Sequence, residues 1–134
     1  MNARQHAILV TGGGGFIGSH LVERLIGRGE RVVVVDNFST GRPENLDAIR
    51  SSRRLTVITA DCSAAIRDLS PGDYKAVYHL AAAVGVRLVV EEPIRTIETN
   101  VHETSAMLRF AAEARAPLLI ASTSEVYGKS EKLP

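Results

Sequence analysis

The chain has 134 residues, which is enough for one domain. Its 45% hydrophobic and 23% charged residues are typical of a globular protein and exclude a disordered or collagen-like chain. Sixteen Lys and Arg residues against fifteen Asp and Glu residues leave a net charge of +1, so charge gives no indication of a nucleic-acid or acidic-membrane partner.

Apolar runs of strand length alternate with stretches of helical period, which predicts βαβ units around a parallel sheet. The apolar centres of these runs are nearly unbroken, as is typical of strands covered by helices on both faces. In chain order, the predicted strands are Ala7–Thr11, Arg31–Asp36, Leu55–Ala60, Ala76–Leu80 and Pro117–Ser122.

Helices are predicted between these strands. The longest has Pro93 at its start and an apolar face formed by Ile94, Ile97, Val101, Leu108 and Ala112. The segment Asn37–Arg42 is predicted to be a loop, and Pro71–Asp73 a turn. The predicted helices are Phe16–Arg28, Pro43–Arg50, Ser63–Leu69 and Pro93–Arg115.

A glycine-rich turn at residues 11–18, Thr-Gly-Gly-Gly-Gly-Phe-Ile-Gly, separates the first predicted strand from the first helix. Glycine permits a tight turn and a close approach of a pyrophosphate to the backbone. The N–H groups at the start of the helix then face the phosphates. Such turns also serve as plain connections, but a strand before it and a helix after it favour a dinucleotide site.

Asp36 ends the second predicted strand. A carboxylate at this place can accept hydrogen bonds from both ribose hydroxyls of an adenosine and repels a 2′-phosphate, so we expect NAD rather than NADP. Two alternatives remain open: Asp36 could merely cap a loop, and Arg42 in the same loop could receive a 2′-phosphate.

The single cysteine, Cys62, can form neither an internal disulfide nor a multi-thiolate metal site, which fits a reducing compartment. The four histidines lack metal-ligand spacing, so we expect no metal. The apolar run Ala7–Val10 is shorter than the roughly 7–15 residues of a signal peptide, and no run reaches the roughly 18 of a membrane helix. We therefore expect a cytoplasmic protein that acts on small molecules.

The motif Thr-Gly-x-x-Gly-x-x-Gly falls on Gly12, Gly15 and Gly18, and Asp36–Arg42 follows it. Together with Asp61-Cys62, His79–Ala82, Thr99-Asn100 and Ser122–Gly128, it resembles the extended short-chain dehydrogenases, the NAD-dependent sugar-nucleotide epimerases, dehydratases and decarboxylases. The resemblance implies an α/β fold, a Rossmann-type doubly wound parallel sheet with strand order 3-2-1-4-5, truncated after its fifth strand. Residues 1–134 would be an incomplete NAD-binding domain without the substrate domain.

The resemblance also implies cofactor contacts. Asp61 would meet the adenine through its carboxylate and Cys62 through its backbone amide, while Ala81 and Ala82 would line the phosphate and nicotinamide side. Plainer interpretations remain open: Cys62 as a small half-buried residue, the alanines as packing, and Asn100 as a surface amide. The implied cofactor-binding residues are Gly12, Gly15, Phe16, Ile17, Gly18, Asp36, Asn37, Ser39, Thr40, Gly41, Asp61, Cys62, Leu80, Ala81, Ala82 and Asn100.

Two residues near the end resemble catalytic positions of the family. Thr123 falls where the family has the Ser or Thr that bonds the substrate hydroxyl under oxidation, although Ser122–Ser124 could also be a polar loop or helix cap. Glu125 resembles the carboxylate that dehydratases and sugar-acid decarboxylases use near C5 of the sugar. Dehydratases have Asp before that Glu, whereas this chain has Ser124, which favours epimerisation or decarboxylation.

The family's Tyr-x-x-x-Lys pair, whose Tyr acts as general base, is absent from these 134 residues, since none of Tyr74, Tyr78 and Tyr127 begins it. It would lie beyond Pro134. We therefore expect the NAD-binding part of a sugar-nucleotide epimerase that oxidises a UDP-sugar transiently at C4, inactive by itself. The alternatives are a UDP-glucuronate decarboxylase-like enzyme and a catalytically inactive nucleotide-binding or interaction module.

The expected partners of the parent enzyme are a nucleotide-sugar and a second copy of the chain, with no nucleic acid and no membrane. By resemblance, a homodimer would form through the long helix Pro93–Arg115.

Overall fold

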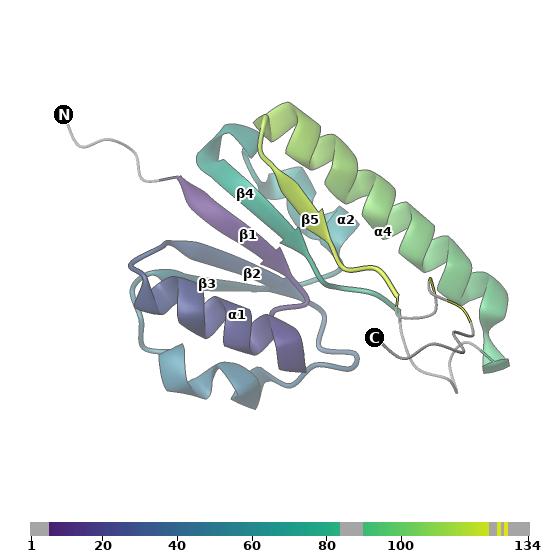
Figure 1. The fold of residues 1–134 in the computed structure, drawn as a ribbon, viewed down its shortest axis with the longest axis horizontal. Helices are drawn as coiled ribbons and strands as arrows, with labels where there is room; N and C mark the ends of the chain where they lie inside the picture. The colour runs from purple at the N-terminus through teal and green to yellow at the C-terminus, as the bar shows by residue number, and fades with distance from the viewer. Residues whose placement is uncertain (1–5, 84–89, 124–125, 127, 129–134) are drawn as a thin grey trace.

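A computed structural model describes residues 6–83, 90–123, 126 and 128. Within them, parallel strands form one sheet in the order β3-β2-β1-β4-β5 (Figure 1). This confirms the predicted fold class and strand order. Because the order reverses between β1 and β4, the loops after these two strands diverge and leave a crevice at the carboxyl edge of the sheet. The strands are β1 (Ala7–Thr11), β2 (Val32–Asp36), β3 (Leu55–Thr59), β4 (Tyr74–His79) and β5 (Leu118–Ile120).

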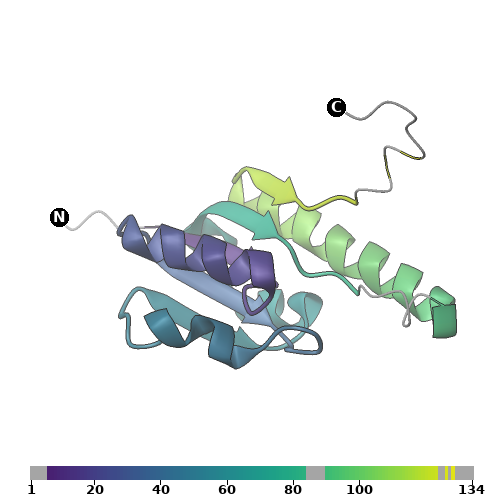
Figure 2. The ribbon, with the colours of Figure 1, turned by 60° about the horizontal axis from the view of Figure 1, so that its bottom comes forward.

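Helical segments cover both faces of this sheet (Figure 2). One face packs α1 (Phe16–Gly27) and the 3₁₀ segment η1 (Pro43–Ile49) against Ile8, Val10 and neighbouring valines. The other face packs α2 (Cys62–Ala65) and α4 (Pro93–Ala114) against Ala7 and Leu9. Alternate residues of β1 therefore belong to two separate cores, as expected for a strand covered on both sides. Two short 3₁₀ segments, η2 (Ile66–Asp68) and η3 (Pro71–Asp73), complete this second layer.

The two weaker predicted helices differ from the structure. Pro43–Arg50 is a 3₁₀ helix that ends at Ile49 and buries one hydrophobic residue, Leu46. The predicted helix Ser63–Leu69 is the single α-turn α2 followed by η2. Short segments gain few intrahelical hydrogen bonds for the cost of nucleation, so packing rather than helix propensity decides their form.

The observed ends of several strands also differ from the predicted ends. β4 begins at Tyr74, two residues earlier than predicted, because Tyr74 pairs with Ala7 of β1. The Tyr74 ring also packs edge-on against Phe110, with the ring centroids 5.4 Å apart. β2 begins at Val32, and β5 is limited to Leu118–Ile120. Leu119 and Ile120 are about half exposed, so the prediction that helices cover both faces of every strand is wrong for β5 among the described residues.

The predicted apolar face of α4 is not the face that packs on the sheet. Ile94, Ile97 and Val101 are 71%, 64% and 65% exposed, Leu108 is 50% exposed, and Ala112 is exposed as well. The sheet instead receives Met107, Phe110 and Ala111, with Thr96 buried on the same helix. The buried stripe contains polar residues in its first half, so a search for apolar periodicity selects the other stripe. No helix within the described ranges is long and apolar enough to span a membrane.

Candidate functional site

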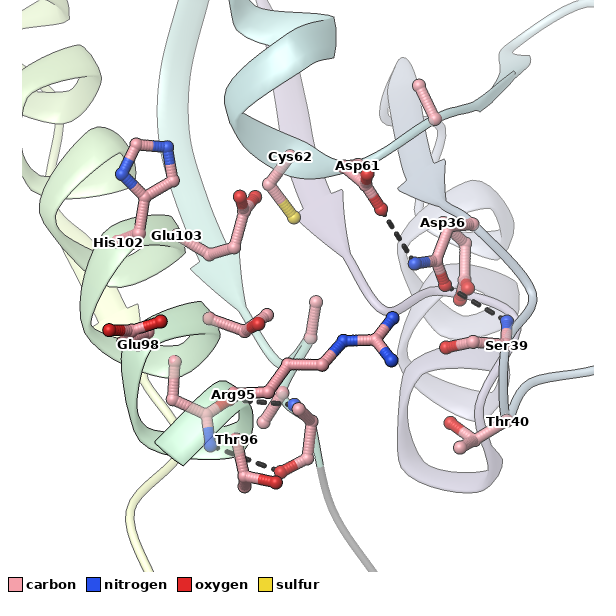
Figure 3. A pocket seen from close by; sticks show the side chains of 17 residues that line it. Asp36, Ser39, Thr40, Asp61, Cys62, Arg95, Thr96, Glu98, His102 and Glu103 are labelled. Atoms are coloured by element: carbon pink, nitrogen blue, oxygen red, sulfur yellow. Dashed lines mark hydrogen bonds between the residues drawn. The ribbon is translucent and has the colours of Figure 1, made fainter. Parts of the chain in front are cut away.

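A cleft of about 700 Å³ lies at the carboxyl edge of the sheet, between the loops after β2 and β3 and the first half of α4 (Figure 3). One wall is lined by Asp36, Asn37, Ser39, Thr40, Ala60, Asp61 and Cys62. The opposite wall is lined by Ala81, Ala82, Ala83, Arg95, Thr96, Glu98, Thr99, Asn100, His102 and Glu103.

The glycine-rich turn joins β1 to α1 beside this cleft, and two of its glycines are required by close contacts. Gly12 has a φ of +72°, and a Cβ there would lie 2.7 Å from the amide nitrogen of Ala81. A Cβ on Gly18 would collide with the carbonyl oxygen of Gly12. A larger residue at either place would push α1 or the segment after β4 outward, so glycine brings the N-terminus of α1 against the turn.

Asp36 is buried at the end of β2, with its carboxylate held from two sides. The Gly14 N–H donates to Oδ2 at 2.8 Å, and the Phe38 N–H donates to Oδ1 at 2.8 Å. Each carboxylate oxygen has two lone pairs, so both can accept another hydrogen bond. The Asp36 carboxylate is therefore fixed in place, and each of its oxygens can accept a hydrogen bond from one hydroxyl of a vicinal diol.

The loop after β2 is fastened to the glycine turn through the Gly14 carbonyl oxygen. That oxygen accepts hydrogen bonds from Asn45 Nδ2 at 2.7 Å and from the Arg42 backbone N–H at 3.0 Å. Further along the wall, Asn37 Nδ2 donates to Asp61 Oδ1 at 2.7 Å, and Asn37 Oδ1 accepts from the Ser39 N–H at 2.9 Å. The loops after β2 and β3 are thus joined side by side along one wall.

A buried hydrogen-bond chain lies beneath the floor of the cleft. Thr11 Oγ1 accepts from the Ala81 N–H at 3.2 Å and forms a hydrogen bond with His79 Nδ1, 2.7 Å away. On the other side of the ring, His79 Nε2 lies 3.4 Å from Thr104 Oγ1. Burial lowers the pKa of His79, against the smaller opposing effect of Glu103. The neutral ring therefore joins β1, β4 and α4 under Ala81.

Glu103 connects α4 to the start of α2. Its carboxylate accepts from the Ser63 backbone N–H at 2.7 Å and from the Ser63 hydroxyl at 2.6 Å, which satisfies an N–H of the first turn. Burial, and secondarily the charge of Glu103, raise the pKa of the neighbouring Cys62 to about 12. The Cys62 side chain is therefore a protonated thiol in the wall and not a nucleophile.

Asn100 holds the segment after β4 with both ends of its amide. Its Oδ1 accepts from the Ala83 N–H at 2.7 Å, and its Nδ2 donates to the Ala83 carbonyl oxygen at 3.1 Å. The Asn100 side chain is therefore not an isolated surface amide, because it binds the backbone of the segment that carries Ala81 and Ala82.

The structure brings together nine of the sixteen cofactor residues that the sequence implies. Asp36, Asn37, Ser39, Thr40, Asp61, Cys62, Ala81, Ala82 and Asn100 line the cleft. The remaining seven lie outside its lining: Gly12, Gly15, Phe16, Ile17, Gly18, Gly41 and Leu80.

Several of these seven support the cleft. A Cβ on Gly41 would press on the Gly14 backbone, and the Leu80 N–H donates to the Thr11 carbonyl oxygen at 3.1 Å. Phe16 and Ile17 are exposed at the start of α1.

Of the two predicted catalytic residues, Thr123 is exposed beyond β5, and its carbonyl oxygen accepts a hydrogen bond from the Val126 N–H. Glu125 lies outside the described residues.

Sequence reasoning missed several residues of the α4 wall: Arg95, Thr96, Glu98, His102 and Glu103. The signal for some of them was present, because Thr96 and Glu103 stand four residues before and three after Asn100, on the same helical face. Within the described residues, no group of three or more His, Cys, Asp or Glu side chains could hold a metal ion.

Comparisons with known proteins show that the chain is similar to enzymes that act on sugar nucleotides. The chain is 48% identical over 121 residues to UDP-glucuronic acid decarboxylase 1 of Arabidopsis thaliana, covering 90% of this chain and 27% of the relative. It is similar to the solved UDP-N-acetylglucosamine 4-epimerase of Methanobrevibacter ruminantium, with 32% identity and a TM-score of 0.80 over 98% of this chain and 42% of that one. A UDP-glucose 4-epimerase of Brucella ovis, solved with NAD, gives 31% identity and a TM-score of 0.77 over 96% and 39%.

The chain therefore spans about a quarter to two fifths of the length of these relatives. A model of the family described as GDP-mannose 4,6 dehydratase matches residues 9–134, which is nearly the whole chain. This chain belongs to that family of sugar-nucleotide enzymes.

Proposed function

We propose that the chain binds NAD, with the adenosine half of the cofactor in the cleft. The observation that carries this proposal is the Asp36 carboxylate, which is held by the Gly14 and Phe38 N–H groups and retains acceptor capacity on both oxygens. The ribose hydroxyls would donate to it, and the pyrophosphate would lie over the glycine turn at the N-terminus of α1. The same carboxylate would repel a 2′-phosphate, which favours NAD over NADP.

The residues present fit this cofactor. Glycines keep the turn free of side chains where the pyrophosphate would pass. Asp61 and Cys62 line the wall that carries Asp36, where they would meet the adenine. The small side chains of Ala81 and Ala82 would leave room for the nicotinamide side. The Brucella ovis epimerase that this chain resembles was solved with NAD, which supports the assignment.

For the whole enzyme, we propose oxidation and reduction of a UDP-sugar at C4. Bound NAD would supply a hydride acceptor that returns the hydride later in the cycle. Thr123 would orient the substrate hydroxyl from its place after β5, and Glu125 would act on the sugar near C5. Epimerisation is one candidate reaction, and decarboxylation of a UDP-sugar acid is the second, favoured by the 48% identity to the Arabidopsis decarboxylase.

Calorimetry with NAD and NADP tests the cofactor assignment. Asp36→Ala should weaken NAD binding by about 1–3 kcal/mol through lost charge-assisted hydrogen bonds. It should also reduce the difference in affinity between NAD and NADP. Asp68→Ala removes an exposed carboxylate outside the cleft and should change neither affinity. Absence of heat with NAD on folded protein would contradict the proposal, and a preference for NADP would assign the role to Arg42.

The 134-residue chain alone is not expected to turn over UDP-glucose or UDP-glucuronate. A threonine hydroxyl is too weak a base to remove the C4 hydroxyl proton, and loss of a general base costs roughly 10²–10⁴-fold in rate. Chromatography after incubation with NAD would detect an epimer or a pentose product. Product above a control without protein would contradict this expectation and make Glu125 the first residue to substitute.

We also propose that the whole enzyme forms a dimer through α4. The exposed apolar stripe Ile94, Ile97, Val101 and Leu108 supports this, because a helix face of this kind is usually covered by a partner. Val101→Glu should shift sedimentation of the whole enzyme toward the monomer, whereas Arg109→Glu, on the same helix, should not. An unchanged dimer in Val101→Glu would contradict the proposal.

A further inference from the structure

We propose that Arg95 is the cation that neutralises the pyrophosphate of a dinucleotide bound in the cleft. This inference rests on the proposed NAD site and assigns a residue that neither the glycine motif nor Asp36 accounts for.

The charges along the cleft create the need for such a residue. Its lining contains four carboxylates, from Asp36, Asp61, Glu98 and Glu103. Among the lining residues that the structure describes, Arg95 is the one Lys or Arg side chain. A pyrophosphate adds two further negative charges, which the carboxylates would repel unless a cation stood between them.

The placement of Arg95 meets that need. Figure 3 shows its side chain reaching from the first turn of α4 into the middle of the cleft, with the guanidinium directed toward the wall that carries Ser39. The N-terminus of α1 contributes N–H donors and the partial charge of a helix end, but no full positive charge from a side chain of its first turn. Arg95 would supply that charge from the opposite side, with paired donors that match phosphate oxygens.

The present partner of Arg95 can be displaced. Its Nη1 lies 2.8 Å from Glu92 Oε2, three residues earlier, and both side chains are largely exposed. Exposed ion pairs of this kind contribute little to stability because water and salt screen them. Three of the four cleft carboxylates are held elsewhere: Asp36 by backbone N–H groups, Asp61 by Asn37 and Glu103 by Ser63. Arg95 is therefore available to a phosphate, and Glu92 competes with that phosphate.

Titration calorimetry with ADP-ribose, adenosine and 2′-AMP separates the groups involved. Arg95→Gln should weaken ADP-ribose binding by about three- to tenfold, leave adenosine binding unchanged, and reduce the loss of affinity with added salt. Arg95→Lys should retain the salt dependence and bind more tightly than Arg95→Gln but less tightly than the wild type, because it keeps the charge and loses the paired donors. Glu92→Gln should strengthen ADP-ribose binding by about two- to threefold, because it removes the competing carboxylate. Arg109→Gln, an exposed position of α4 outside the cleft lining, is the matched control and should resemble the wild type.

The outcomes distinguish this inference from the proposed function. If the wild type binds ADP-ribose and Arg95→Gln binds it equally well, Arg95 is not the phosphate cation, although the NAD proposal stands. If Arg95→Gln weakens 2′-AMP but not ADP-ribose, the guanidinium faces a 2′-phosphate and the inference is overturned. If the folded wild type binds neither NAD nor ADP-ribose, the proposed function and this inference fail together.

Discussion

The two walls of the cleft are built from different parts of the chain. On the wall that carries Asp36, here called the main-chain wall, backbone N–H groups of Gly14 and Phe38 hold the carboxylate. The glycine turn that adjoins this wall depends on Gly12 and Gly18, which allow close approach of backbone to backbone. On the α4 wall, side chains make the contacts, since Asn100 holds Ala83 and Glu103 holds Ser63. Substitutions that add atoms to a glycine should therefore damage the main-chain wall. Substitutions that remove side-chain atoms should damage the α4 wall, here called the side-chain wall.

The largest effect is expected from one added methyl group on the main-chain wall. Gly18→Ala would place a Cβ against the Gly12 carbonyl oxygen, a backbone atom that cannot move aside without shifting the turn. We expect a loss of about 1–3 kcal/mol in the free energy of unfolding, together with loss of measurable NAD binding. Chemical denaturation and calorimetry measure the two effects.

Gly27→Ala in the same helix is the matched control. Nothing lies within 4 Å of a Cβ at Gly27, so this variant should be neutral or more stable by up to about 1 kcal/mol, with unchanged NAD affinity. Equal behaviour of the two variants would refute the close-contact account of the main-chain wall.

The side-chain wall is broken by removal of the Glu103 carboxylate. Glu103→Ala leaves the Ser63 N–H and hydroxyl without this acceptor and should lower the free energy of unfolding by about 1–2 kcal/mol. Glu113→Ala, at an exposed position further along α4, should change it by less than about 0.5 kcal/mol. A Glu103→Ala variant as stable as Glu113→Ala would show that α4 does not depend on this link.

The smallest effect concerns His79, which lies beneath both walls. Because burial lowers its pKa from the ordinary 6.5, the unfolded chain takes up a proton below pH 6.5 that the folded chain does not. The stabilising contribution of the neutral ring is therefore present above pH 6.5 and is lost as the pH falls from there toward the lowered pKa.

Denaturation curves over this acidic range measure the effect. His79→Gln should show a shallower loss of stability with acid than the wild type, whereas His6→Gln, at an exposed position before β1, should reproduce the wild-type slope. Equal slopes in all three proteins would mean that His79 does not carry the pH dependence.

Sequence predicted the main-chain wall better than the side-chain wall, for a physical reason. Glycines and a strand-ending Asp mark places where the backbone itself contacts a ligand, so residue types and spacing carry the information. The order of the strands was implied by the resemblance to the extended short-chain dehydrogenases, and the structure confirms it. In α4, the stripe against the sheet mixes Asn100 and Glu103 with Met107 and Phe110, while a more uniformly apolar stripe faces outward. Hydrophobic period alone cannot choose between two such stripes.

Other features needed the three-dimensional arrangement. Asn45 lies 31 residues from the Gly14 carbonyl oxygen it holds, and His79 lies 68 residues from Thr11. No local pattern in the sequence marks such pairs, because each depends on how the parallel strands align. Arg95 was missed for a related reason: an arginine three residues after a glutamate on a helix usually indicates an exposed ion pair.

The most direct test of the cleft is a titration of isotope-labelled protein with ADP-ribose, followed by backbone amide NMR shifts. If ADP-ribose binds in the cleft, the largest shifts fall on Gly14, Phe38, Cys62 and Ala81, with small shifts at Val101 and Leu108 on the exposed stripe of α4. Shifts concentrated on that stripe, with Gly14 and Phe38 unaffected, would contradict the assignment of the cleft as the dinucleotide site.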